Sequence, residues 1–441
     1  MKIKFSNIVK LFFISSVIGV GISYSKLYFF HIMLIILIFF YLYKNNYVLK
    51  IKKLQTNYHY FFYFMLFWYA ISMIWSSNKI YSLRYLAYII FGVSIILVMI
   101  YYCDNLEKQI EIFNIFKIIF VFEIILCILE ALQLFRWPIS PYSFSLKFFR
   151  REMKVDLNWS SNILNEIFST PTGFHWNPNN LATAMVIIFP FFILDKNIFV
   201  KLLGSFSIFF IIYKTDSRTN LFAFIIQILS YFIFISKKKY LYIIFFIFLI
   251  LIIVLNINFV IDFAKNSSNK FLIKILDFSD LIKNYLDYSN INFSDTSSVS
   301  IRKILILNGL EALKKSCFLG VGAGNSEYIQ ELKGGVGSRN ITSMHFFWFE
   351  LLVDGGIVFF IFLLIWYFKI LLKLYFIYNR SANYILKYFS SSTFISLIGF
   401  FIGCISASSV IYFFPMWILY GFSIVTINNY MMYKKYQFLK I

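Results

Sequence analysis

Histidine, arginine and carboxylate side chains gather in one part of the sequence, residues 298–360. Arg302 lies in an amphipathic segment, and His345 stands at the start of an apolar run in which Glu350 and Asp354 share one helix face. Histidine is the side chain best suited to accept a proton near neutral pH. A polar segment that unites these groups at the edge of an apolar helix predicts a reactive site at a membrane surface.

A glycine-rich turn, GVGAGN at residues 320–325, divides this segment. It suggests a phosphate-binding loop only weakly, because the Lys-Ser/Thr pair and the strand–helix setting of such loops are absent. The preceding helix is predicted to end near Ser316, and the glycines supply left-handed turn geometry. We interpret the turn as the hinge that returns the Arg302 helix towards the membrane. Arg339 and His345 follow as further potential ligands.

A second candidate region ends in GFHWNPNN, just before another apolar run. Pro178 is expected to end any preceding helix, and Asn179 or Asn180 to cap the one that follows. The exposed start of a helix favours anions. His175 stands beside this helix start, so His175 and Asn180 are candidate ligands, although a lone histidine is more often structural.

Three other charged features admit two interpretations each. Arg218, at the head of an apolar run, is either a ligand or a cation whose stem extends to the headgroups. SLKFFRREMK at 145–154 reads as an interfacial amphipathic helix, with a cradle for an anionic lipid head or acidic glycan as the less favoured alternative. Glu123 and Glu130 share a helix face, where buried acids indicate either a cavity or contacts that fix helix packing.

The composition identifies the chain as a polytopic membrane protein. Of its 441 residues, 60% are hydrophobic and 22% aromatic, more apolar surface than a soluble protein of this size could hide. The net charge of +21 resides in short breaks between apolar runs, which indicates topology and anionic headgroups rather than nucleic acid. Four scattered cysteines support neither a disulfide framework nor a zinc site.

The fold expected is all-α, with about 12 transmembrane helices and a long helical extracytoplasmic loop, in a GT-C-like arrangement. Lysines in the short loops place both termini in the cytoplasm and two long loops, 135–179 and 261–344, outside. The chain is expected to divide into residues 1–260 with nine spans, the large loop 261–344 with amphipathic helices that begin at 270–288, and residues 345–441 with three spans. The predicted spans are 7–24, 27–43, 58–76, 84–102, 110–134, 180–194, 198–213, 219–235, 240–260, 345–373, 388–409 and 411–429.

Four motifs in this order and topology resemble the O-antigen ligase and Wzy-type polymerase superfamily. They are GFHWNPNNLA, the DSR at the head of a span, R-x17-G with GVGAGN, and H-x4-E-x3-D-G-G at the next span, and together they cover about 170–360. Many members carry His-Asn after the long loop, whereas His345 is followed by Phe346 here.

The resemblance implies a function and assigns roles to residues. It implies an inner-membrane glycosyltransferase that polymerises undecaprenyl-diphosphate-linked oligosaccharide units on the outer face of the membrane. Arg218 and Arg302 correspond to the arginines that hold the donor diphosphate, and His345 to the general base. Asn180 and Glu350 match further family positions, and together with His175 and Arg339 they are assigned to substrate binding. Neither a metal nor another cofactor is expected, and the partners are the lipid-linked glycan, membrane lipid and, optionally, a chain-length regulator.

Three alternatives stay open at this stage. A ligase of the same family would pass the finished glycan to a lipid or protein acceptor. A flippase or transporter of the lipid-linked unit would show internal repeats and interrupted spans near the bilayer middle, neither of which is evident. A sensor or scaffold would have no need of Arg302 and His345 near the outer surface.

Overall fold

The computed structural model describes residues 4–44, 54–236, 298–333, 342–407 and 410–438. The predicted span at 240–260, the amphipathic segment 270–288 and Arg339 lie outside these ranges. The described part is helical apart from a small antiparallel hairpin, β1 (Ser23–Tyr24) and β2 (Leu27–Tyr28), which joins the first two helices. A mostly helical fold is therefore confirmed for the described residues.

Each predicted span inside the described ranges coincides with an observed helix. Five helices are long and apolar enough to cross a membrane by themselves, namely α4, α5, α15, α16 and α9 with its terminal π-helical turn. The bundle helices are α1 (Phe5–Ile18), α2 (Phe29–Lys44), α3 (Tyr60–Ser72), α4 (Lys79–Tyr102), α5 (Leu106–Ala131), α7 (Pro178–Ile193), α8 (Ile198–Lys214), α9 (Arg218–Ser230), α15 (Phe347–Arg380), α16 (Tyr384–Gly403) and α17 (Phe414–Phe438).

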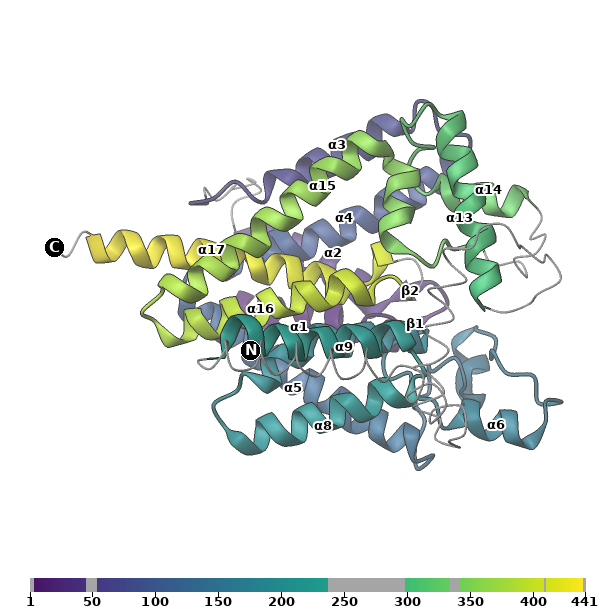
Figure 1. The fold of residues 1–441 in the computed structure, drawn as a ribbon, viewed down its shortest axis with the longest axis horizontal. Coiled ribbons are helices and arrows are strands. Elements are labelled where there is room, and N and C mark those ends of the chain that lie inside the picture. The colour runs from purple at the N-terminus through teal and green to yellow at the C-terminus, as the bar shows by residue number, and fades with distance from the viewer. Residues whose placement is uncertain (1–3, 45–53, 237–297, 334–341, 408–409, 439–441) are drawn as a thin grey trace, which may run out of the picture.

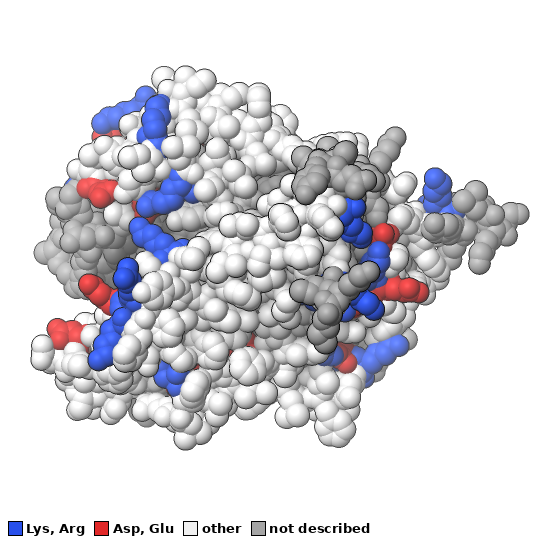
Figure 2. Space-filling view, turned by 180° about the vertical axis from the view of Figure 1, so that it is seen from behind, with Lys and Arg blue, Asp and Glu red and all other residues white. Residues whose placement is uncertain are grey.

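The bundle has two unlike ends. The short helices α6 (Ser161–Phe168), α13 (Ser298–Lys315) and α14 (Asn325–Leu332) gather with the β1–β2 hairpin at one end, which we call the loop end (Figure 1). The C-terminal end of α17 extends from the opposite end. Lys and Arg side chains form two bands, one towards each end, with a broad and nearly uncharged surface between them (Figure 2). Such a surface suits a hydrocarbon layer, as expected for a multi-pass membrane protein.

Asparagine recurs as the residue that starts these helices. Its side-chain oxygen accepts hydrogen bonds from the first free backbone N–H groups, which would otherwise lack partners. Asn177 caps α7 in this way, with Pro178 as the first helical residue, so the expected cap at Asn179 or Asn180 is wrong by two or three positions. The asparagine caps are Asn78, Asn105, Asn177, Asn197 and Asn383.

Helix α16 occupies the middle of the bundle and packs against α7, α9, α15 and α17. Its serines and threonine at 390–393 are buried, and small residues of this kind let helices approach closely. Gln227 of α9 crosses this contact and donates hydrogen bonds to the carbonyls of Val186 (2.8 Å) and Ile395 (3.2 Å). The central helices are thus joined by buried polar contacts as well as apolar ones.

Helix α15 is interrupted at Gly356, which the sequence did not lead us to expect. Gly356 has φ 77°, a conformation that glycine adopts without strain, and a Cβ at this position would lie 2.2 Å from the carbonyl oxygen of Leu319. The interruption frees helix carbonyls, and the glycine-rich turn occupies the gap. Val321 N donates to Val353 O (2.9 Å), and Gly322 N donates to Asp354 O (3.1 Å). Residues 318–324 therefore fasten α13 and α14 to α15.

Candidate functional site

A cavity of about 390 Å³ opens at the loop end. Its walls come from the end of α1, the β1–β2 hairpin, the loop before α7 and the start of α17. Two arginines and a lysine, Arg150, Arg151 and Lys26, line it, so we call it the basic cavity. A shallower hollow of about 700 Å³ adjoins it, and the two share Arg150, Arg151 and Trp176. His175 and Asn180, both predicted ligands, line the basic cavity.

The loop that carries these arginines does not form the amphipathic helix favoured by the sequence. A 3-10 helix covers only Phe144–Phe149, and Arg150 then adopts a left-handed conformation with φ 53°. The turn directs the chain over the hairpin, where Ser25 N donates to Phe149 O (2.9 Å). The predicted amphipathic helix over 145–154 is therefore wrong, and the cradle for an anion stays a prediction.

Trp176 and the hairpin fix the orientation of the cavity cations. The guanidinium of Arg151 lies 4.6 Å from the indole centroid of Trp176, and the Lys154 ammonium lies 5.3 Å from it. Arg151 also donates a hydrogen bond to the carbonyl oxygen of Ser25. Cation–π contacts of this kind hold a positive charge without neutralising it.

Glu130 anchors the loop between α5 and α7. Its side chain is fully buried and accepts hydrogen bonds from the backbone N–H groups of Thr172 (2.7 Å), Gly173 (2.8 Å) and Trp137 (3.0 Å). Arg136 Nη1 lies 3.6 Å from Glu130 Oε2. Burial lowers the pKa of this arginine, and the charge of Glu130 offsets part of that shift. The structure therefore favours the packing interpretation for Glu130 over a relay.

Glu123 lies on the same face of α5, about two turns before Glu130. It contacts His175 and the same loop. Phe174 N donates to Glu123 Oε1 (3.3 Å), and His175 Nε2 lies 3.3 Å from that oxygen. Burial lowers the pKa of His175 to about 3, so the imidazole is neutral at neutral pH. His175 is 8% exposed and lines the basic cavity, while its Nε2 faces Glu123 and is enclosed.

His345 stands just before α15 in a left-handed conformation with φ 47°. Few non-glycine residues adopt this conformation, and such outliers cluster at functional sites. Burial, together with the positive charges of Arg302 and Lys154, lowers the pKa of His345 to about 4. The imidazole is therefore neutral at neutral pH and can accept a proton. Met344, the preceding residue, packs in one apolar cluster with Ile306 and Leu310 of α13, so His345 lies beside the helix of Arg302.

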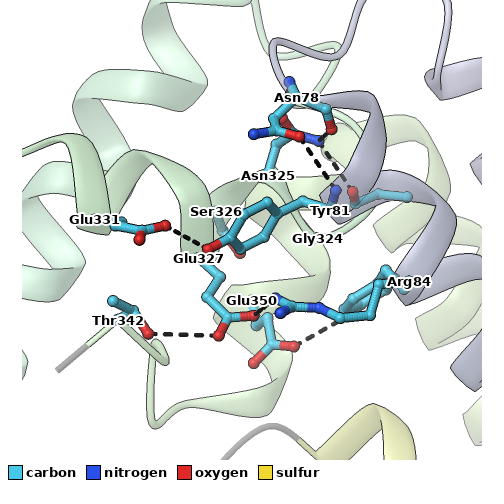
Figure 3. A network of polar contacts seen from close by, with 12 residues as sticks. Asn78, Tyr81, Arg84, Gly324, Asn325, Ser326, Glu327, Glu331, Thr342 and Glu350 are labelled. Atoms are coloured by element: carbon cyan, nitrogen blue, oxygen red, sulfur yellow. Dashed lines mark hydrogen bonds and ion pairs between the residues drawn. The ribbon is translucent and has the colours of Figure 1, made fainter.

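A polar network ties α14 to α4 (Figure 3), and α14 in turn contacts α13, the helix of Arg302. Asn325, at the start of α14, accepts from Asn78 N (2.8 Å) and donates to Ser82 Oγ (2.9 Å), which ties it to α4. Arg84 of α4 forms an ion pair with Glu327 (2.7 Å). Asn308 of α13 then donates to Gln330 of α14 (2.9 Å). Arg302 thus projects from a helix whose position α4 and α15 determine.

Glu350 and Asp354 lie buried in the first turns of α15. Asp354 accepts from Gly324 N (3.1 Å) and Ser326 N (2.8 Å), so it caps the start of α14. Within the described residues Glu350 takes a single hydrogen bond, from the Tyr85 hydroxyl (3.3 Å). Asp354 is therefore a structural anchor that the sequence grouped with the ligands, while the position of Glu350 is compatible with either role.

Arg218 is the first residue of α9, close to the start of α7. Asn220 links the two helix starts, because its amide donates to Asn179 O (3.4 Å) and its oxygen accepts from Thr183 (3.2 Å). Arg218 and Asn180 are thus on neighbouring helix starts at the loop end. One group comprises His345, Arg302 and Lys154, whose charges influence one another. A second comprises His175, Asn180 and the rest of the basic cavity. The two adjoin because Trp176 of the cavity contacts Lys154. Across the described ranges, no three His, Cys, Asp or Glu side chains are placed to hold a metal ion.

Comparisons with known proteins find similarity to a family and to a bacterial relative. Residues 203–364 match the family model described as O-antigen ligase, a range that contains Arg218, Arg302, His345 and Glu350. The chain is also similar to the teichuronic acid biosynthesis protein TuaE of Bacillus subtilis (strain 168), at 23% identity over 376 residues. That similarity covers 83% of this chain and 71% of the relative.

Proposed function

Because the chain belongs to the O-antigen ligase and Wzy-type polymerase superfamily, we propose that it is a membrane glycosyltransferase that polymerises lipid-linked oligosaccharide units. The proposed donor is a glycan on undecaprenyl diphosphate, and the acceptor is a sugar hydroxyl. The loop end would face outward, with the termini in the cytoplasm. The protein would act in the synthesis of a surface polysaccharide, and its Bacillus subtilis relative is a teichuronic acid biosynthesis protein.

The observation that carries this proposal is the position of His345 at the loop end, directly before α15 and beside α13, the helix of Arg302. The acceptor oxygen would attack the anomeric carbon as the bond from that carbon to the diphosphate oxygen breaks. The diphosphate would leave with the electron pair, and His345 would take the hydroxyl proton. Arg302 and Arg218 would stabilise the leaving group, since guanidinium groups form paired hydrogen bonds to phosphate oxygens.

The lowered pKa of His345 fits this sequence of events. Burial and the charges of Arg302 and Lys154 disfavour protonation of the His345 imidazole. A bound diphosphate would offset those charges, because a nearby anion favours the protonated imidazole. The pKa of His345 would then rise towards neutral when substrate is present, which is where a general base works best.

His345→Ala in a deletion strain tests the proposal. We expect loss of long polymer and accumulation of single-repeat lipid intermediates, with normal amounts of the variant in the membrane. The control is His59→Ala. His59 directly precedes α3, at the end of the bundle opposite the loop end. Polymer of wild-type length in the His345→Ala strain would rule out His345 as the general base.

The deletion strain itself separates the three activities. Short glycans that still reach the surface support a polymerase. Full-length glycans that lack their normal attachment indicate a ligase. Glycans retained inside the cell indicate a flippase.

A further inference from the structure

The proposed transfer reaction makes no use of the basic cavity. Lys26, Arg150 and Arg151 line it, whereas Arg302, Arg218 and His345 do not. Lys26 and Arg150 are exposed and Arg151 is half-buried, so the three charges stay hydrated, and together they give the cavity a positive potential that attracts anions. The cavity therefore favours an anionic occupant of its own.

The cavity is built to hold a ligand rather than being an accidental hollow. Arg151 is held in one orientation by Trp176 at 4.6 Å and by the carbonyl of Ser25. His175, in the same lining, follows the loop residues that Glu130 anchors, and its Nε2 faces Glu123. The lining is therefore positioned before a ligand arrives, as is usual for small-molecule sites.

The lining suits a charged sugar better than a simple headgroup. The cations at one side are accompanied by groups that bind hydroxyls, namely Asn180, Tyr28 and Tyr412. Phe413 and Phe414 form an apolar wall of the kind that contacts the carbon face of a ring. At about 390 Å³ the cavity lies within the usual range for small-molecule sites. One acid, Glu152, lines the adjoining hollow among four cations, so the anion preference persists there.

We propose that the basic cavity binds an anionic sugar of the acceptor glycan, with its carboxylate or phosphate on Arg150, Arg151 and Lys26. This inference rests on the proposed polymerase function, because it names the chemistry of the acceptor. Recognition of an acidic sugar here would position the neighbouring sugar towards His345, since Lys154 contacts Trp176 and also influences His345. Repeat units with the acid would be elongated, and neutral units would be poor acceptors.

The test measures binding directly, with the full chain in phosphatidylcholine nanodiscs. The probes are a glucuronosyl disaccharide and its glucosyl counterpart, which differ only in the carboxylate. We expect the acidic probe to bind at least about tenfold more tightly, as one charge-assisted contact is typically worth about that much. The double variant Lys26→Gln/Arg150→Gln should lose this preference. It leaves Arg151 and its bond to Ser25 in place, so the hairpin should keep its structure.

A matched control removes two charges elsewhere. Lys4→Gln/Lys314→Gln changes two exposed lysines that line neither the cavity nor the hollow, and it should keep the preference. Equal binding of both probes by the wild-type protein would overturn the inference. So would loss of acidic-probe binding in phosphatidylglycerol nanodiscs, because that result would identify a lipid headgroup as the occupant.

Failure of the proposed function would look different. A wild-type protein that transfers no sugar from a lipid-linked donor refutes the polymerase. A wild-type protein that polymerises but binds acidic and neutral probes alike refutes the cavity assignment alone.

Discussion

Helices α5 and α15 carry similar sets of buried polar groups at the loop end. Each has two buried carboxyl side chains, Glu123 and Glu130 in α5 and Glu350 and Asp354 in α15. Each is associated with a loop histidine, which is His175 for α5 and His345 for α15. The comparison distinguishes the carboxyl groups and histidines that hold the structure together from those that are available for chemistry.

One carboxyl group of each pair anchors a loop. Glu130 accepts three backbone N–H groups of the loop that carries the basic cavity. Asp354 accepts two from the turn that starts α14. A backbone N–H that is buried needs an acceptor, and these loops have no regular structure to supply one. The second carboxyl group, Glu123 or Glu350, has fewer contacts.

The two histidines show the difference between the regions. His175 lies against Glu123, and burial alone accounts for its lowered pKa. His345 lies near Arg302 and Lys154, and both cations contribute to its lowered pKa. An anionic substrate would change the charge environment of His345 directly. The α15 region is thus the better candidate for proton transfer, and the α5 region positions the loop that lines the basic cavity.

Glu130→Gln is the strongest test of the anchoring role, and we expect a large loss of stability. The glutamine amide has one oxygen for three N–H groups, and its NH₂ would face a donor. Leaving a buried group unsatisfied costs about 1–3 kcal/mol, and the loss of charge-assisted bonds adds to this. We expect the free energy of unfolding to fall by roughly 2–4 kcal/mol. Thermal unfolding in detergent measures it.

The control for this prediction is Glu107→Gln, at an exposed position in the first turn of α5. It should leave the unfolding midpoint almost unchanged. An equally small change for Glu130→Gln would mean that the backbone contacts of Glu130 do not hold the loop.

The sequence predicted the helices well because apolar runs of spanning length are a strong signal. It also located the left-handed turn: Gly320, Gly322 and Gly324 all have positive φ. The family resemblance selected Arg302 and His345, and the match to the O-antigen ligase family supports that choice of region. These features depend on local patterns or on motifs within a short range of the chain.

Features that depend on distant contacts could not be read. The interruption of α15 requires residues 318–324 to supply donors to its carbonyls, and neither segment shows this alone. The cap at Asn177 was missed because Asn179 and Asn180 are equally good cap residues by type. The basic cavity joins the β1–β2 hairpin to Arg150 and Trp176, and no spacing in the sequence brings these segments together.

Arg302 gives the next largest effect and tests the electrostatic side of the comparison. Its charge lowers the pKa of His345, so Arg302→Gln should raise that pKa. A base must be deprotonated to act, so the acid limb of the rate profile should move to higher pH. Arg302→Lys keeps the charge and should leave that limb near its wild-type position. Both variants should lose about 10–100-fold in rate, since the paired guanidinium contacts are lost.

The measurement is initial polymerisation rate against pH for the wild-type protein and both variants. Identical acid limbs for Arg302→Gln and the wild-type protein would show that Arg302 does not act on His345. A matching experiment on Lys314→Gln, another cation of α13, should give a wild-type profile.

Glu123→Gln should have the smallest effect, and the contrast with Glu130→Gln decides whether the two carboxyl groups of α5 differ. The two changes are chemically identical and occur on one helix. The glutamine oxygen can take the position of Oε1 and still accept from Phe174 N, and the NH₂ would replace Oε2, which makes no hydrogen bond within the described residues. We therefore expect less than about 1 kcal/mol of lost stability in the same thermal unfolding assay. A loss as large as that for Glu130→Gln would mean that both carboxyl groups anchor the loop, and that the α5 region is structural throughout.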